Sequence, residues 1–243
     1  MGEMTMKKLQ IIMMLAILGI TAYATASQAA RTHDQILEQA RVELERVCGS
    51  LVPYMERPEN VSRFEVVDED VINAFADNQG RVAVYMGMID FFQNEDELAA
   101  VCGHELAHLS REHIKKSMST GILATVVSEV VGGTAGNIVG NLIYTKDSRS
   151  HEREADRNGL LYAWHAGFDP YASVGLWEGM SQMRDTMALE KYLSTHPVHE
   201  ERIENFHVLL YRMCKEGRTT RYCEEIQADP ELQRLYREFE SRD

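Results

Sequence analysis

Residues 104–108 read His-Glu-Leu-Ala-His, a spacing that could bind a metal ion. On a helix, positions i and i+4 lie one turn apart on the same face, so His104 and His108 can turn ring nitrogens toward one cation. Glu105 points partly into the same space, where it can act as general base toward a water on the metal without being a ligand itself. The chemistry that this pattern predicts is metal-assisted hydrolysis.

A catalytic zinc ion also needs a third protein ligand and an open position. Glu152 is the best candidate, because it begins a second predicted helix over residues 152–164. Glu152, Asp156 and Gly159 share one face of that helix. Asp156 can therefore accept a hydrogen bond from a ligand imidazole while Glu152 binds the metal.

Other histidines and charges near these motifs fit the site less well. A third histidine six residues after the second is excluded, because that position is Ile114. His113 is one residue out of place, and we interpret it as an exposed histidine at a helix end. We interpret Arg153 and Glu154 as part of a solvated, charged helix face. The remaining ligand set of two histidines and one glutamate favours Zn2+, with one ion per chain.

The first motif needs a helix to position it, and we predict one near residues 95–117. Asn94 and Glu97 have the spacing of a capping box, with Asn94 as the N-cap. Apolar residues continue beyond them at helical spacing. The small residues of this stretch, which indicate a tightly packed and buried helix, are Ala99, Ala100, Gly103 and Ala107.

With these motifs, the chain resembles the zinc metallopeptidase family of the HtpX, CAAX prenyl protease and Oma type, and most closely its small periplasmic bacterial members. The resemblance covers about residues 35–210 and rests on segments 73–75, 81–87, 94–108, 148–156, 166–170 and 195–202. The site residues that it implies are the zinc ligands His104, His108 and Glu152, the general base Glu105 and the ligand-supporting Asp156.

The resemblance also implies roles for two residues near the end of the domain. His196 would face the metal, and in relatives this histidine can take the fourth coordination position and hold the enzyme latent. Arg202 would lie nearby, and either His196 or Arg202 could support the oxyanion once any latent ligation is released. Without the resemblance, His196 would be interpreted as a loop histidine beside Pro197. His207 is interpreted as having no catalytic role.

Two strands are predicted before the motif helix, at residues 63–67 and 82–85. In zinc peptidases of this plan, a strand such as 82–85 forms a sheet edge beside the metal, to which an extended substrate adds through main-chain hydrogen bonds. We therefore expect an α+β fold, mainly α: a zincin-like metalloprotease domain with a small antiparallel sheet packed on the catalytic helix. Further helices are expected at residues 32–52, 171–190, 199–213 and 224–241.

The first residues indicate an exported protein, and the composition limits the size of the core and the kind of partner. A chain of 243 residues with 44% hydrophobic content can build one sizeable core, and its net charge of −13 argues against nucleic acid as a partner. Residues 1–29 combine two lysines, an apolar run and small-x-small cleavage patterns, which predicts a signal peptide and a periplasmic location. The alternative is an uncleaved anchor facing the periplasm. Residues 30–243 would form a single zinc metallopeptidase domain with a helical C-terminal extension.

Export makes disulfides possible for the four cysteines. Cys214 and Cys223 bracket what looks like a turn between two helices, and we expect them to pair. Cys102 lies two residues before His104 and could pair with Cys48 or be a buried free thiol. We favour the free thiol.

The segment 121–144 is apolar, with Glu129 as its single charge and five glycines. Its length and hydropathy would allow a membrane span, but glycine lowers helix stability. We expect a soluble lid or interface hairpin, through which the protein could contact a membrane or a partner.

The expected function is that of a zinc-dependent endopeptidase acting on unfolded or misassembled envelope proteins in protein quality control. His196 could hold it latent, and outer-membrane assembly machinery is a further expected partner. The alternative is a zinc-containing, chaperone-like assembly factor for outer-membrane proteins with little proteolysis. A metal hydrolase acting on something other than peptides is disfavoured by the edge strand expected before the catalytic helix.

Overall fold

The computed structural model describes residues 32–119, 146–183, 189–196, 200–218 and 223–240. The signal peptide and the hairpin predicted for residues 121–144 lie outside the described residues. Within the described part of the chain, no helix is long and apolar enough to cross a membrane. The chain divides into two units, of which the first ends at Val42 and the second, Glu43–Asp243, contains the sheet and the site.

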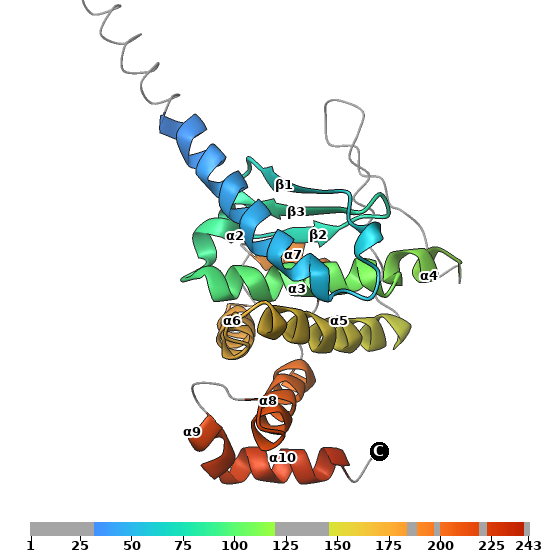
Figure 1. Cartoon of the computed structure of the whole chain (residues 1–243), viewed down its shortest axis with the longest axis vertical. Coiled ribbons are helices and arrows are strands. Elements are labelled where there is room, and N and C mark those ends of the chain that lie inside the picture. Colours follow the sequence, from blue (N-terminus) through green and yellow to red (C-terminus); the bar gives the residue numbers. More distant parts are fainter. Residues whose placement is uncertain (1–31, 120–145, 184–188, 197–199, 219–222, 241–243) are drawn as a thin grey trace, which may run out of the picture. The chain divides into compact units, whose positions relative to one another are not determined.

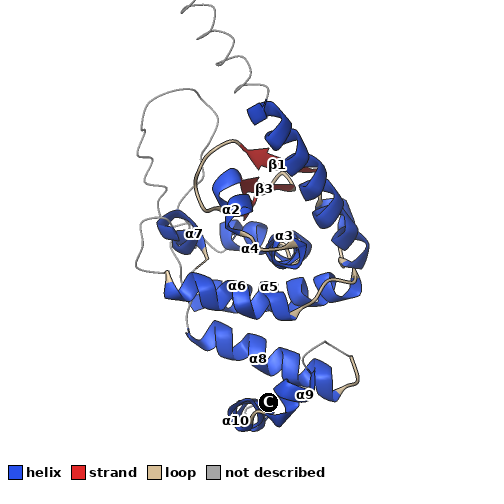
Figure 2. Ribbon diagram, turned by 90° about the vertical axis from the view of Figure 1, so that its left-hand side faces the viewer, coloured by secondary structure: helices blue, strands red, loops and turns tan. Residues whose placement is uncertain are grey.

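The second unit combines a small sheet with a larger set of helices (Figures 1 and 2). The strands are β1 (Arg63–Val67), β2 (Ala74–Ala76) and β3 (Arg81–Tyr85). The labelled helices are α2 (Met86–Phe91), α3 (Glu95–Ser110), α4 (His113–Ser119), α5 (Lys146–His165), α6 (Tyr171–Gln182), α7 (Glu190–Thr195), α8 (Glu200–Lys215), α9 (Cys223–Ala228) and α10 (Pro230–Glu240). Residues 32–51 are also helical, as predicted. The α+β, mainly α fold class is confirmed.

The sheet is mixed, with the strand order β1-β3-β2. β2 pairs with β3 antiparallel, and β1 pairs with β3 parallel. Short connections reverse the chain twice, so the first and third strands run the same way and become neighbours. The expectation of an antiparallel sheet with residues 82–85 at its edge is therefore wrong: β3 is central, and β1 and β2 are the edges. β2 was not predicted as a strand, because three residues, Ala-Phe-Ala, are too few to show an alternating pattern.

Helix α3 lies between the sheet and α5 (Figure 1), and it packs against both. Its N-cap is Asn94, as predicted, whose side chain accepts a hydrogen bond from Glu97 N at 3.1 Å. The Glu97 carboxylate accepts in turn from Gln93 N at 2.8 Å. Every residue from Leu98 to Ser110 is buried. The chemically active residues of α3 therefore lie in the core of the unit.

The crossing of α3 and α5 depends on two glycines. A Cβ on Gly103 would lie 2.5 Å from the carbonyl oxygen of Gly159, and one on Gly159 would lie 2.6 Å from the carbonyl carbon of Gly103. Real side chains do not approach backbone this closely, so the two helices touch backbone to backbone. This contact brings the histidines of α3 within reach of the carboxylates of α5.

Helix α3 ends at Ser110, earlier than the predicted boundary near residue 117. Arg57 Nη1 donates to the carbonyl oxygen of Ser110 at 2.7 Å, and Asn60 Nδ2 donates to that of Leu109 at 2.9 Å. These bonds satisfy carbonyls that the helix end leaves open. Glu112 then adopts the left-handed conformation, with φ of 56°, and α4 begins at the next residue. The predicted continuous helix is wrong because residues distant in sequence cap α3.

Two disulfides join the four cysteines. Cys214–Cys223 is the predicted pair. Cys48–Cys102 contradicts the expected free thiol: both residues are fully buried, and their Cα atoms lie 5.3 Å apart, within the range for a disulfide. The bond ties the first described helix to α3 directly beside the metal-binding motif.

Removing either disulfide is expected to destabilise the protein, by an amount that depends on loop length. In the chain-entropy model, the loss is about 4 kcal/mol for Cys48–Cys102 and about 2.5 kcal/mol for Cys214–Cys223, because the sequence separations are 54 and 9. Urea unfolding of the two double alanine variants under non-reducing conditions measures both losses. Equal losses would contradict the loop-length argument.

Candidate metal centre

Four side chains from three regions of the chain meet in one buried cluster. His104 and His108 come from α3, Glu152 from α5, and His196 directly follows α7. One ligand-type atom from each lies within 4.8 Å of the others. The four candidate ligands and Glu105 are all buried. The structure thus brings together the three predicted ligands and the histidine that the resemblance implied.

The geometry of the cluster fits a cation. His104 Nε2 lies 3.1 Å from His108 Nε2 and 3.2 Å from His196 Nδ1. Glu152 places its two oxygens 3.3 Å from the Nε2 atoms of His104 and His108. A neutral imidazole carries one acceptor nitrogen, and several such nitrogens facing one point beside a carboxylate form the donor set that zinc prefers.

Asp156, from α5, and Arg202, from α8, support this cluster. Asp156 Oδ1 lies 2.9 Å from His104 Nδ1, the ring nitrogen that faces away from the other ligands. Arg202 Nε donates to Asp156 Oδ2 at 2.8 Å, and its Nη1 lies 3.3 Å from Glu152 Oε2. The guanidinium also lies 4.1 Å from the centre of the Trp177 ring. A buried arginine thus balances the charge of two buried carboxylates.

The charges in the cluster shift the pKa values of its members. Burial opposes the proton on His104, but hydrogen bonds to Asp156 and Glu152 outweigh it and raise the pKa to about 9. Burial also opposes the charged form of Glu152, yet His196 and His108 hold its pKa well below the usual range. Glu152 is therefore held as an anion, the form that binds a cation.

Glu105 lies beside the cluster in a position suited to a base. Its side chain is buried, and its Oε1 lies 3.4 Å from His196 Nε2. This oxygen has no hydrogen-bond partner among the described residues. A buried carboxylate oxygen without a hydrogen bond is costly, and native proteins keep such groups mainly where they serve function.

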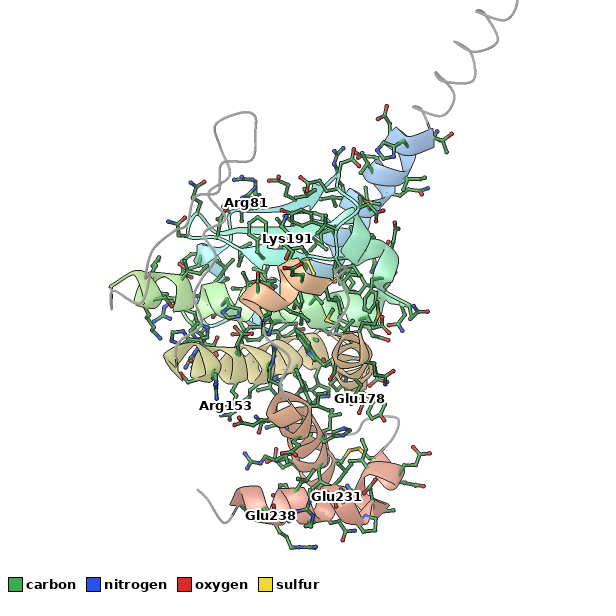
Figure 3. The ribbon with its side chains drawn as sticks, turned by 180° about the vertical axis from the view of Figure 1, so that it is seen from behind. Arg81, Arg153, Glu178, Lys191, Glu231 and Glu238 are labelled. Carbon is green, nitrogen blue, oxygen red and sulfur yellow. A yellow bond between two sulfur atoms is a disulfide. The ribbon has the colours of Figure 1, made fainter. Side chains whose placement is uncertain are left out.

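Helix α7 positions His196 at the cluster. His196 is the C-cap residue of α7, and its backbone N donates to the carbonyl oxygen of Tyr192 at 2.8 Å. On the same helix, Lys191 lies over the ring of Tyr85 in β3, 4.3 Å from the ring centre (Figure 3). The sheet thereby anchors the helix that places His196.

His113 and Glu154 differ from their predicted environments. His113 is buried, not exposed, and its Nε2 lies 3.0 Å from Glu154 Oε2. Glu154 is half-buried and also accepts from Arg111 Nε at 2.5 Å, so it is not part of a solvated face. Arg153 is exposed as predicted and pairs with Glu201 at 3.3 Å (Figure 3). The sequence carried no local signal for His113, because its environment depends on the break after α3.

A helix-borne His-Glu-x-x-His pair completed by a glutamate from a second helix is a ligand arrangement of metallopeptidases. Residues 36–209 match the family model described as Peptidase family M48, and the chain belongs to this family. The chain is 32% identical over 167 residues to the mitochondrial metalloendopeptidase OMA1 of Arabidopsis thaliana, covering 63% of this chain and 34% of the relative.

Bacterial relatives match the same region. The chain is 28% identical over 171 residues to the beta-barrel assembly-enhancing protease of Escherichia coli (strain K12), covering 63% of this chain and 35% of the relative. It is 33% identical over 161 residues to a putative beta-barrel assembly-enhancing protease of Vibrio cholerae, covering 58% and 33%. The chain therefore spans about a third of the length of these curated relatives.

Proposed function

We propose that this chain is a zinc-dependent endopeptidase. The observation that carries the proposal is the buried cluster of His104, His108 and Glu152 with Glu105 beside it. We assign the first three residues as ligands to one zinc ion per chain. Membership of peptidase family M48 supports a peptide substrate.

When bound, zinc would supply a Lewis acid that lowers the pKa of a water and polarises the scissile carbonyl. Glu105 would accept the proton of the attacking water and later donate it to the leaving amine. Asp156 would hold His104 with its proton on Nδ1, so that Nε2 is free to bind zinc. Arg202 would fix Asp156 and Glu152 by charge-assisted bonds. Arg202 or His196 could support the oxyanion once His196 no longer fills the ligand position.

The sheet offers a place for an extended substrate. β2 is an edge strand and packs against α3, which carries the proposed base. An unfolded chain could add to β2 through main-chain hydrogen bonds, a mode that tolerates varied sequences. This favours unfolded or misassembled proteins as substrates.

We further propose that the enzyme acts in the periplasm on envelope proteins, with outer-membrane assembly machinery as a partner. The two disulfides support an oxidising compartment. The relatives named for beta-barrel assembly and the signal-peptide pattern of residues 1–29 point the same way.

Zinc removal tests the proposal. The purified protein is expected to contain about one equivalent of zinc and to cleave unfolded casein. Treatment with a chelator should abolish cleavage, and added zinc should restore it. A chelator-insensitive cleavage, or a protein without bound metal, would overturn the assignment.

A second candidate function, a chaperone-like assembly factor with little proteolysis, is favoured by the position of His196. Its Nδ1 lies 3.2 Å from Glu152 Oε2 and 3.2 Å from His104 Nε2, so it can fill the fourth ligand position. A filled position would keep water and substrate from the metal.

Replacing His196 by alanine separates the two functions. If His196 holds a peptidase latent, His196→Ala is expected to raise casein cleavage by about fivefold or more, because the competent state becomes the major one. A matched His207→Ala variant should cleave casein at the parent rate. Absence of cleavage in both the parent and His196→Ala proteins, with zinc bound, would favour the assembly factor.

A further inference from the structure

His108 has a structural partner on the side that faces away from the cluster. Its Nε2 faces Glu152, and its Nδ1 lies 3.1 Å from Nδ1 of His113. We propose that His113 is a positioning residue for the metal, which fixes the tautomer and the ring orientation of His108. This inference rests on the proposed zinc site and extends it to a chain of bonds that ends at Glu154 and Arg111.

The contacts form one continuous line. His113 bridges His108 and Glu154, with its Nδ1 3.1 Å from His108 and its Nε2 3.0 Å from the carboxylate. Arg111 Nε donates to the other oxygen of Glu154 at 2.5 Å. His113 is 2% exposed, and the ring of His151 stacks on it with centroids 4.2 Å apart. The bridging ring is therefore held on both edges and on one face.

A metal on His108 would determine which atom donates and which accepts in each hydrogen bond of this line. If Nε2 of His108 binds the metal, its proton must lie on Nδ1, which then donates to His113. His113 must accept at Nδ1 and so carry its own proton on Nε2, which donates to Glu154. Glu154 accepts from both His113 and Arg111, as an ionised carboxylate can. No member of the line is left with two facing donors or two facing acceptors.

The same logic holds for the other histidine of the motif. His104 presents Nε2 to the cluster, and its Nδ1 lies 2.9 Å from Asp156. Metal-binding histidines usually give the second ring proton to a carboxylate, a carbonyl or water. His108 has no carboxylate at this position among its described contacts, and His113 takes that place and passes the bond on to Glu154.

The backbone break after α3 makes this contact possible. On a continuous helix, residues i and i+5 lie about 140° apart around the axis, so His113 would point away from His108. The left-handed Glu112 ends this geometry and starts α4 at His113. The break therefore brings a residue from outside the His-Glu-x-x-His spacing to the back of its second histidine.

Two substitutions at one position test the proposal. His113→Phe keeps a ring but removes the acceptor, and it is expected to weaken zinc binding by about 10- to 100-fold. His113→Asn places an oxygen two bonds from Cβ, as Nδ1 is, and it should retain zinc affinity within about threefold. Affinity is measured by competition with a chromophoric chelator, and the visible spectrum of the cobalt-substituted protein reports ligand geometry.

The control is His207→Phe. His207 makes the same kind of bond, 3.1 Å to Glu178, between α8 and α6, and neither residue belongs to the cluster (Figure 3 labels Glu178). This variant should leave zinc affinity and the cobalt spectrum unchanged. Thermal unfolding of the metal-free proteins checks that each variant folds.

Each outcome decides the proposal. Weak zinc binding and an altered cobalt spectrum in His113→Phe, both restored in His113→Asn, support it. Wild-type affinity in His113→Phe overturns it, as does equal weakening in both variants, since equal weakening indicates packing rather than an acceptor. Zinc binding without cleavage in both the parent and the His196→Ala protein defeats the endopeptidase alone, whereas a parent protein that binds no zinc defeats both proposals.

Discussion

Glu105→Gln is expected to abolish peptide cleavage while zinc remains bound. Glutamine has the size and shape of glutamate but cannot accept the proton of an attacking water. General base catalysis contributes about 10²- to 10⁴-fold to a rate, so kcat/KM should fall by that range. The ligand residues His104, His108 and Glu152 are unchanged, and Glu105 lies beside them rather than among the four clustered residues.

The measurement combines cleavage of unfolded casein with zinc content by metal analysis. Glu178→Gln, on the partly exposed face of α6, is the matched control and should cleave at the parent rate. A Glu105→Gln protein that cut casein as fast as the parent would remove Glu105 from the mechanism. Loss of zinc together with activity would show instead that Glu105 holds the metal.

Gly159→Ala is expected to destabilise the protein strongly. Its Cβ would meet the backbone of Gly103 and the backbone nitrogen of His104, each at 2.6 Å. Backbone cannot swing aside as a flexible side chain can, so α3 and α5 must move apart. Overpacking of this kind costs about 1–3 kcal/mol or more. The separation would also move Glu152 away from the histidines, so zinc affinity should fall as well.

Two other glycines provide the control for this variant. Gly175 and Gly179 lie in α6, and a Cβ on either would meet nothing within 4 Å. Alanine at these positions should be neutral or stabilise the protein by up to about 1 kcal/mol, since glycine weakens a helix. Urea unfolding of the metal-free proteins measures the difference. A Gly159→Ala protein as stable as Gly175→Ala would contradict the close crossing.

The first described helix, residues 32–51, and the first turn of α3 could be predicted because their signals are local. Residues 224–241, expected as one helix, form the two helices α9 and α10. Asn94 and Glu97 specify the cap within four residues, and the apolar spacing follows at once. The strand order could not be predicted in this way. β2 is three residues long, and whether β1 pairs with β2 or with β3 is decided by packing between segments distant in sequence.

In the candidate site, too, the features with local sequence signals could be predicted and those that depend on distant segments could not. The spacing of His104 and His108 is one helical turn, so the sequence alone predicts that they share a face. The prediction that His113 is exposed is wrong because its position depends on the end of α3. Arg57 and Asn60, about fifty residues earlier in the sequence, cap that end. The wrong choice of a free thiol for Cys102 has the same cause, since no pattern near Cys102 decides between a free thiol and a bond to Cys48, 54 residues earlier.

Three consecutive residues of α3 engage three different partners. Cys102 is bonded to Cys48, Gly103 touches the backbone of α5, and His104 faces the clustered ligands. Successive helical residues point about 100° apart, so these attachments surround the helix. Turning α3 about its own axis by one residue would break all three at once. The rotation of α3 about its axis is therefore fixed on three sides. An insertion or deletion before His104 changes this rotation and should be tolerated far less well than a substitution, which does not.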